Sequence, residues 1–161
     1  MKRFLFLALI LSALTLSAQT DPAHTPARCD TAALYAGSHA LLANALGALP
    51  APAVLPQYAD GQEQMRAYFK EHPLTDSRAM EMIFRVHIAV LVNCQGQIAD
   101  TRVVSSGKGF LAALAEQVRE TVAQLPGAWT AAQDAEGNTV DCWQMISFTV
   151  SLQSLEKASL L

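Results

Sequence analysis

The stretch MIFRVHIAVLVNC, residues 82–94, decides how the rest of this sequence is interpreted. Its apolar side chains recur at every second position, which is the pattern of a β-strand with one buried face. Gln95-Gly96 follows, where a hairpin turn needs a residue that tolerates positive φ, and IADTRVVSS, residues 98–106, resumes a β-rich pattern. We therefore predict a β-hairpin, whose first strand buries Phe84, Val86, Ile88, Val90 and Val92.

Beyond Gly109 the periodicity changes to that of a helix. Apolar residues recur three and four positions apart, and Pro126-Gly127 ends the run. The residues of this face are Phe110, Leu111, Leu114, Val118, Val122 and Leu125.

A last strand is predicted from VDCWQMISFTVSL, residues 140–152, which alternates again. One face carries Cys142, Ile146, Phe148, Val150 and Leu152. The opposite face carries Trp143, Met145, Ser147 and Thr149. Residues 153–161 are expected to form a flexible tail.

Two helices are predicted upstream of the hairpin. The first runs from Thr31 to Leu46 and is followed by a stiff proline linker up to residue 55. The second begins after Asp60, whose side chain can accept from first-turn amides while Glu63 reaches back, a capping-box arrangement. His72-Pro73 ends it.

The amino terminus has the three sections of a secretory signal peptide. Lys2-Arg3 precedes the apolar run FLFLALILSALTL, and Ser17-Ala18-Gln19 supplies small residues for cleavage after Ala18. The apolar run is shorter than the roughly 20 residues that span a bilayer. We expect residues 1–18 to be removed and the protein to be periplasmic or secreted, with no stable membrane insertion.

The charge balance excludes one class of function. The chain has 11 basic and 14 acidic residues, and removal of Lys2 and Arg3 would change the formal net charge from -3 to -5. Sequence-independent binding to nucleic acid depends on a basic stripe that neutralises phosphates. No such stripe is present, so no nucleic-acid partner is expected.

Residues 56–152 together resemble the TonB carboxy-terminal domain family, in the form found in Bacteroidetes-type envelope proteins. FRVHIAVLVNCQGQI resembles the family's long strand and glycine turn, the helix followed by Trp129 resembles its helix and tryptophan motif, and VDCWQMISFTV resembles its closing strand. PQYADGQE, residues 56–63, with Met65 and Tyr68-Phe69, is similar to its lead-in. The sequence departs from the family pattern in having Thr130 after Trp129 where a proline is usual, and Asp60-Gly61 where two glycines are typical.

The resemblance implies an α+β fold, a small antiparallel ββαβ sheet with one helix on one face, preceded by two short helices. Trp129 is expected to pack the helix end against the sheet, with the lining of a partner site as the alternative. The resemblance also implies that the last strand lies antiparallel beside the first, which would bring Cys94 and Cys142 together as a cross-strand disulfide. The alternative is two separate buried thiols. Cys29 would then be free, join two chains in a homodimer, or compete for a partner.

Function is expected to follow from the edge of the last strand. In the resembling family the domain holds an extended segment of an outer-membrane receptor, so Trp143, Met145, Ser147 and Thr149 become candidate partner-binding residues for strand addition. Without a retained anchor and a long spacer, the chain would not itself transmit energy. The alternative is a stand-alone envelope structural protein whose amino-terminal helix covers that edge.

No chemistry is predicted. His87 lies on the strand face opposite Cys94, so a cysteine–histidine pair is not favoured. The four histidines are scattered, without HxH, HExxH or CxxC spacing, so we expect no metal site, no cofactor and no enzymatic activity.

Overall fold

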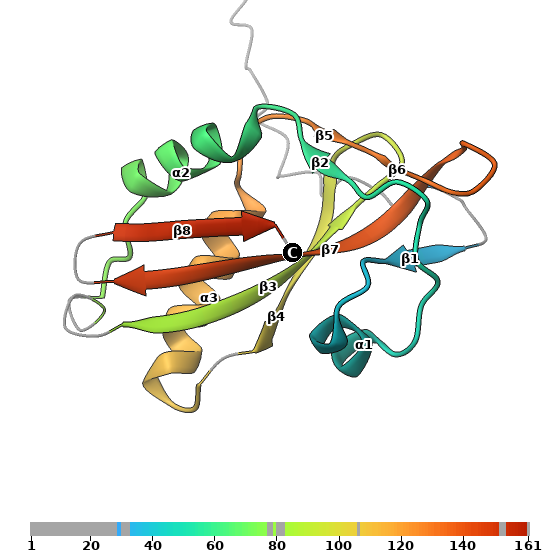
Figure 1. The fold of residues 1–161 in the computed structure, drawn as a ribbon. Helices are drawn as coiled ribbons and strands as arrows, with labels where there is room; N and C mark the ends of the chain where they lie inside the picture. Colours follow the sequence, from blue (N-terminus) through green and yellow to red (C-terminus); the bar gives the residue numbers. More distant parts are fainter. Residues whose placement is uncertain are drawn as a thin grey trace, which may run out of the picture.

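The computed structural model describes residues 29, 33–76, 79, 83–105, 107–151 and 154–160. The predicted signal peptide, residues 1–18, lies outside them. The described chain has an α+β fold in which a curled mixed sheet separates three helices (Figure 1). Their bounds are α1 (Ala40–Leu46), α2 (Gly61–Glu71) and α3 (Phe110–Ala123). None of the described helices combines the length and the hydrophobicity that crossing a membrane requires.

The centre of the sheet is built from the predicted hairpin and the predicted last strand. β3 (Phe84–Val92) and β4 (Ile98–Ser105) form the predicted hairpin, and β7 (Thr139–Ser151) pairs antiparallel with β3. Val92 lies opposite Cys142 and Val86 opposite Phe148 in this register. The predicted hairpin, helix and last strand are therefore confirmed.

Three further strands complete the sheet along β7: β1 from a distant part of the chain, and β6 and β8 from either side of β7 in sequence. β1 (Leu34–Ala36) pairs in parallel with residues 141–143, β6 (Ala132–Gln133) pairs with residues 139–140, and β8 (Ser154–Leu160) pairs antiparallel with residues 146–151. A separate ribbon joins β2 (Gln57–Tyr58) to β5 (Trp129–Thr130).

Two predictions at the ends of the chain are wrong. The segment expected to be helical from Thr31 contains β1, and the helix starts only at Ala40, after His39 accepts a hydrogen bond from Leu41 N–H. Pairing with β7 overrides helix propensity here, because it gives the segment sheet hydrogen bonds such as that from Gly37 N–H to the Trp143 carbonyl. The expected flexible tail likewise contains β8, which pairs with β7.

The start of α2 is as predicted, but its capping box is not. Asp60 has helical backbone angles, φ -80° and ψ 0°, and its side chain makes no cap hydrogen bond. A side-chain cap normally requires an extended residue at this position. The Asp60 carboxylate lies instead against Gly127, where a Cβ atom would stand 2.4 Å from its Oδ2. Glu63 remains in the first turn, where the helix dipole favours an acid.

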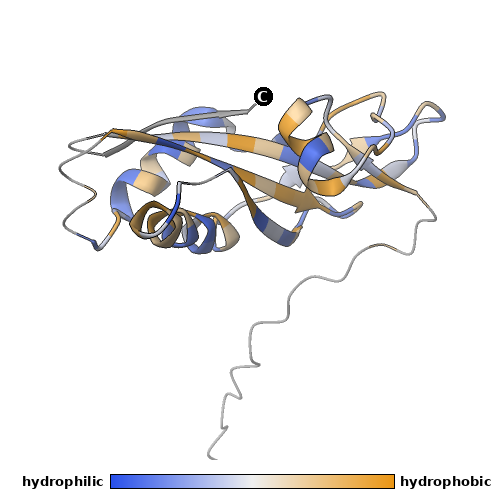
Figure 2. Cartoon of the chain, turned by 90° about the horizontal axis from the view of Figure 1, so that it is seen from below, coloured by the Kyte–Doolittle hydropathy of each residue, from blue (hydrophilic) through white to orange (hydrophobic). Residues whose placement is uncertain are grey.

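The sheet is buried on both faces. One face packs with α2 and α3 in the main core, which contains Phe69, Val86, Val118 and Phe148. The other face, near β1, packs under α1 in a second core around Leu42, Leu91 and Trp143. Figure 2 shows the sheet nearly edge-on, with α3 on one side, α1 on the other and hydrophobic residues along the strands between them.

Candidate functional site

The four candidate partner-binding residues share one face of β7, but they do not form an exposed platform. Trp143 is 2% exposed and Met145 is 0% exposed, because α1 and the chain after it cover them. Ser147 is 7% exposed, and only Thr149 is partly accessible. The expectation of exposed aromatic contact residues is therefore wrong for Trp143, and the alternative of cover by the amino-terminal segment describes it.

Arg102 marks the boundary of this covered region. Its guanidinium lies 4.9 Å from the centroid of the Trp143 ring, and its Nε donates to the Asp100 carboxylate at 3.0 Å. Arg102 and Asp100 line an open cavity of about 350 Å³ between α1 and the sheet. Leu46 and Leu49 are among its apolar walls. The cavity lies beside Trp143 but leaves the indole buried.

The edge of β7 that was expected to accept a partner strand is occupied by the chain itself. β1 and β8 pair with residues 141–143 and 146–151 on the side opposite β3, and β6 pairs with residues 139–140, before the stretch that β3 pairs. The sheet bonds that a peptide would make along these residues are therefore already made within the chain.

The outer edge of β4 is unpaired in the part of the chain that the structure describes, but its geometry is unfavourable for strand addition. Register shifts interrupt its pairing with β3 near both ends of the strand. Thr101 N–H is bonded to the Asp100 carboxylate at 2.8 Å instead of pointing freely outward. Bulges and charged side chains are the usual means by which edge strands resist further pairing.

The disulfide of the described residues joins Cys29 to Cys94, with a Cα–Cα distance of 5.9 Å, and Cys142 is a free, buried cysteine. The predicted Cys94–Cys142 pairing is therefore wrong. The register sets Cys142 opposite Val92 and leaves Cys94 in the turn beyond the end of β3, where its Sγ lies by the Asp141 carboxylate and not by the Cys142 thiol.

The buried environment of Cys142 makes its thiol unreactive. Its thiol packs with Ala132 and Val140, and its Sγ lies 3.5 Å from the Trp143 carbonyl oxygen. Burial raises the pKa of the Cys142 thiol to about 12. It is therefore a small apolar side chain in the fold, so the alternative of two separate buried thiols holds for Cys142 but not for Cys94.

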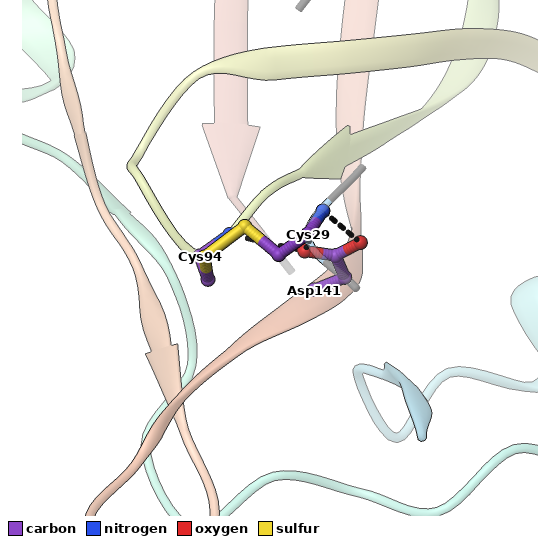
Figure 3. Close-up of side chains that lie close together, drawn as sticks. All are labelled: Cys29, Cys94 and Asp141. Carbon is purple, nitrogen blue, oxygen red and sulfur yellow. Dashed lines mark hydrogen bonds between the residues drawn. A yellow bond between two sulfur atoms is a disulfide. The ribbon is translucent and has the colours of Figure 1, made fainter. Parts of the chain in front are cut away.

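Asp141 lies beside the Cys29–Cys94 disulfide (Figure 3). Its carboxylate is fully buried and accepts hydrogen bonds from the backbone N–H of Cys29 at 3.1 Å and of Cys94 at 3.1 Å. One Sγ atom from each cysteine and one carboxylate oxygen all lie within 4.8 Å of one another. This cluster was missed from the sequence, since its members are 65 and 47 residues apart and form no motif.

The turn that carries Cys94 is held by its neighbours. The buried Asn93 side chain accepts from the N–H groups of Gln95 and Gln97, and Gly96 has a φ of 75°. The Gly96 carbonyl accepts from Trp129 N–H at 2.9 Å. Trp129 is buried in the main core, as predicted, with its ring edge-on to Tyr58 at 5.5 Å.

None of the described histidines joins the cysteines in a cluster of possible metal ligands. The His87 Nδ1 lies 2.7 Å from the Ser147 hydroxyl on the neighbouring strand. Burial, together with Arg85 and His39, lowers the pKa of His87. His72 stacks on Tyr68 at the end of α2, with ring centroids 4.1 Å apart.

Comparisons with protein-family models, with curated proteins and with solved structures find no match to this chain.

Proposed function

We propose that this chain is a non-catalytic structural protein of the cell envelope, periplasmic or secreted, with a TonB-carboxy-terminal-like fold that its own strands complete. The order of β3, β4, α3 and β7 supports this resemblance, because it has the expected strand, strand, helix and strand. The signal peptide predicted over residues 1–18 and an internal disulfide support the location.

One observation carries the choice of a structural role over a peptide-binding role. β7 has β3 on one side and the chain's own β1 and β8 on the other. Strand addition depends on unpaired N–H and C=O groups along an exposed edge. Any contact with an envelope partner would therefore involve side chains on the surface of the folded protein and not backbone pairing along β7.

Hydrogen exchange tests this proposal at residues 143–151. A strand paired on both sides protects the amides that point in either direction, so we expect successive amides of β7 to exchange slowly. The outer amides of β4 serve as an internal reference for an unpaired edge. Fast exchange at every second amide of β7, without any ligand, would contradict the proposal.

Strand addition is the second candidate function, and β8 is the observation that favours it. β8 is a single hairpin arm that follows β7 directly, and it pairs with residues 146–151 on the side away from β3. A partner strand that displaced β8 would gain the same backbone bonds. The partner would be an outer-membrane receptor or another envelope protein.

A truncated chain ending at Leu152 tests the second candidate. A synthetic peptide of residues 153–161 is added to it, with a scrambled peptide as the control. If β7 accepts strands, the truncation speeds exchange at alternate amides of residues 146–151 and the native peptide slows it again. If the truncated chain keeps its circular dichroism spectrum and neither peptide protects these amides, strand addition at this edge is excluded.

A further inference from the structure

We propose that reduction of the Cys29–Cys94 disulfide converts its surroundings into a zinc site, with Cys29, Cys94 and Asp141 as ligands. This inference goes beyond the structural role and does not depend on it. The three side chains come from the segment before β1, from the β3–β4 turn and from the start of β7 (Figure 3).

The spacing of the ligand atoms suits a tetrahedral ion. Zinc binds thiolate sulfur at about 2.3 Å and carboxylate oxygen at about 2.0–2.2 Å, so neighbouring ligand atoms stand roughly 3.6–3.8 Å apart. In the oxidised protein one Sγ from each cysteine and one Asp141 oxygen already lie within 4.8 Å of one another. Breaking the S–S bond lets the sulfurs move apart toward the required separation.

The position of Asp141 suits it to act as a zinc ligand. The carboxylate is 0% exposed and is oriented by backbone N–H groups of both cysteines. Such hydrogen bonds fix a ligating carboxylate in the way that outer partners orient metal ligands. Two thiolates beside this carboxylate would be mutually repulsive, and a divalent cation among them offsets that repulsion.

The exposure of the cysteines also matches a site of this kind. Cys29 and Cys94 are each partly exposed, whereas Asp141 is buried behind them. A zinc ion held by three protein ligands would keep its fourth position toward solvent, for water or an external ligand.

The chemistry balances with a dithiol as the reductant. The dithiol gives two electrons to the S–S bond and becomes a disulfide, while its two protons pass to the sulfurs of Cys29 and Cys94. Zinc then displaces these two protons as it binds the two thiolates and the Asp141 carboxylate. A small-molecule disulfide reverses both steps: it takes two electrons from the two thiolates and becomes a dithiol, the Cys29–Cys94 bond forms again, and the ion is released because disulfide sulfur is a poor metal ligand.

Cys142 provides the internal control, because it is adjacent to Asp141 in sequence but is not part of the cluster. Neighbouring residues of a strand point to opposite faces. The Cys142 thiol packs with Ala132 and Val140 in a separate small core. If zinc simply bound any two thiols, replacing Cys142 would weaken binding as much as replacing Cys29 or Cys94.

The test is zinc titration calorimetry on the purified protein, oxidised or reduced with a phosphine that does not chelate zinc. We expect the reduced protein to bind one equivalent of zinc with release of two protons, and the oxidised protein to bind none. Cobalt in place of zinc should give the near-ultraviolet charge-transfer band of thiolate ligation.

Three variants separate this site from nonspecific thiol binding. In the reduced state, Cys29→Ser and Asp141→Asn should each weaken zinc binding by about tenfold or more, the loss typical even of outer-shell changes. Cys142→Ser should bind as the unsubstituted protein does. The proposal is overturned if reduced wild type binds no tighter than Cys29→Ser, if Asp141→Asn binds equally well, or if Cys142→Ser loses binding. Circular dichroism checks folding, and a reduced chain that unfolds and binds zinc regardless of Asp141 also overturns it.

Discussion

At the scale of single residues, Gly96 shows a constraint that is only partly visible in the sequence. A glycine was expected there for the hairpin turn, and the φ of 75° agrees. The stronger constraint comes from Trp129, whose carbonyl oxygen would lie 2.0 Å from a Cβ atom at position 96. Trp129 is far away in sequence, so no local pattern could predict this contact.

Gly96→Ala should therefore destabilise the protein more than an ordinary glycine replacement at positive φ. The matched control is Gly137→Ala, because Gly137 has a φ of 84° and nothing within 4 Å of its Cβ position. The control should lose about 1–2 kcal/mol of free energy of unfolding from backbone strain alone. Gly96→Ala should lose more, as measured by urea denaturation. Equal losses would mean that the Trp129 backbone moves aside without cost.

His87 predicts a pH dependence of stability. Its pKa in the folded protein is lowered from 6.5, mainly by burial, so the unfolded chain binds the proton more readily. The contribution of neutral His87 is complete above pH 6.5 and is lost as the pH falls from there through the lowered pKa. His87→Gln should flatten this acid-side decline in the free energy of unfolding, measured by denaturation at a series of pH values. An unchanged slope in the variant would contradict the assignment.

The cysteines show that the alternation of side chains along a strand is not sufficient to predict disulfide pairing. Alternation predicts that Cys94 and Cys142 lie on one face. A disulfide also requires that the two residues lie opposite each other in the paired strands. Register here is set by the whole β3–β7 pairing, with Val92 opposite Cys142. The true partner, Cys29, is 65 residues away from Cys94 in a segment without a strand pattern, so pairing could not be predicted.

At the scale of elements, the sequence predicts those that carry their own periodicity. β3, β4, α3 and β7 are of this kind, and all are found within a few residues of their predicted bounds. β1 and β8 are not, because each is stabilised by pairing with β7 and has little pattern of its own. Since these two strands cover the predicted binding edge, the candidate site depended on the elements that were hardest to predict.

α1 has an effect on the sheet that its seven residues do not suggest. Leu42 is fully buried against the face that carries Trp143 and Met145. Leu42→Ala should lower the free energy of unfolding by about 3 kcal/mol, through lost burial and the cavity left behind. Asn44→Ala, on the exposed side of the same helix, should change it by less than about 0.5 kcal/mol. Equal small effects would show that α1 does not hold this face closed.

At the scale of the whole molecule, the disulfide joins the start of the described chain to the central hairpin. It closes a loop of 65 residues, for which the chain-entropy model gives a stabilisation of about 4 kcal/mol. Cys29→Ser should lower the free energy of unfolding by up to this amount, and reduction of the wild type should have a similar effect. Denaturation curves with and without reductant measure both. A variant as stable as the oxidised wild type would mean that the bond does not constrain the unfolded chain.

The position of β7 has a consequence for how the molecule can assemble. β7 is the partner of β1 from one end of the described chain, of β3 from its middle and of β8 from the other end. The β1–β7 and β3–β7 pairings therefore join residues that are distant in sequence, and such long-range pairings form slowly because long loops must close first. During synthesis β1 and β3 must wait for a strand that is made almost last. A fragment ending before Thr139 should remain unfolded, and it should recover structure only when the missing carboxy-terminal piece is supplied in trans.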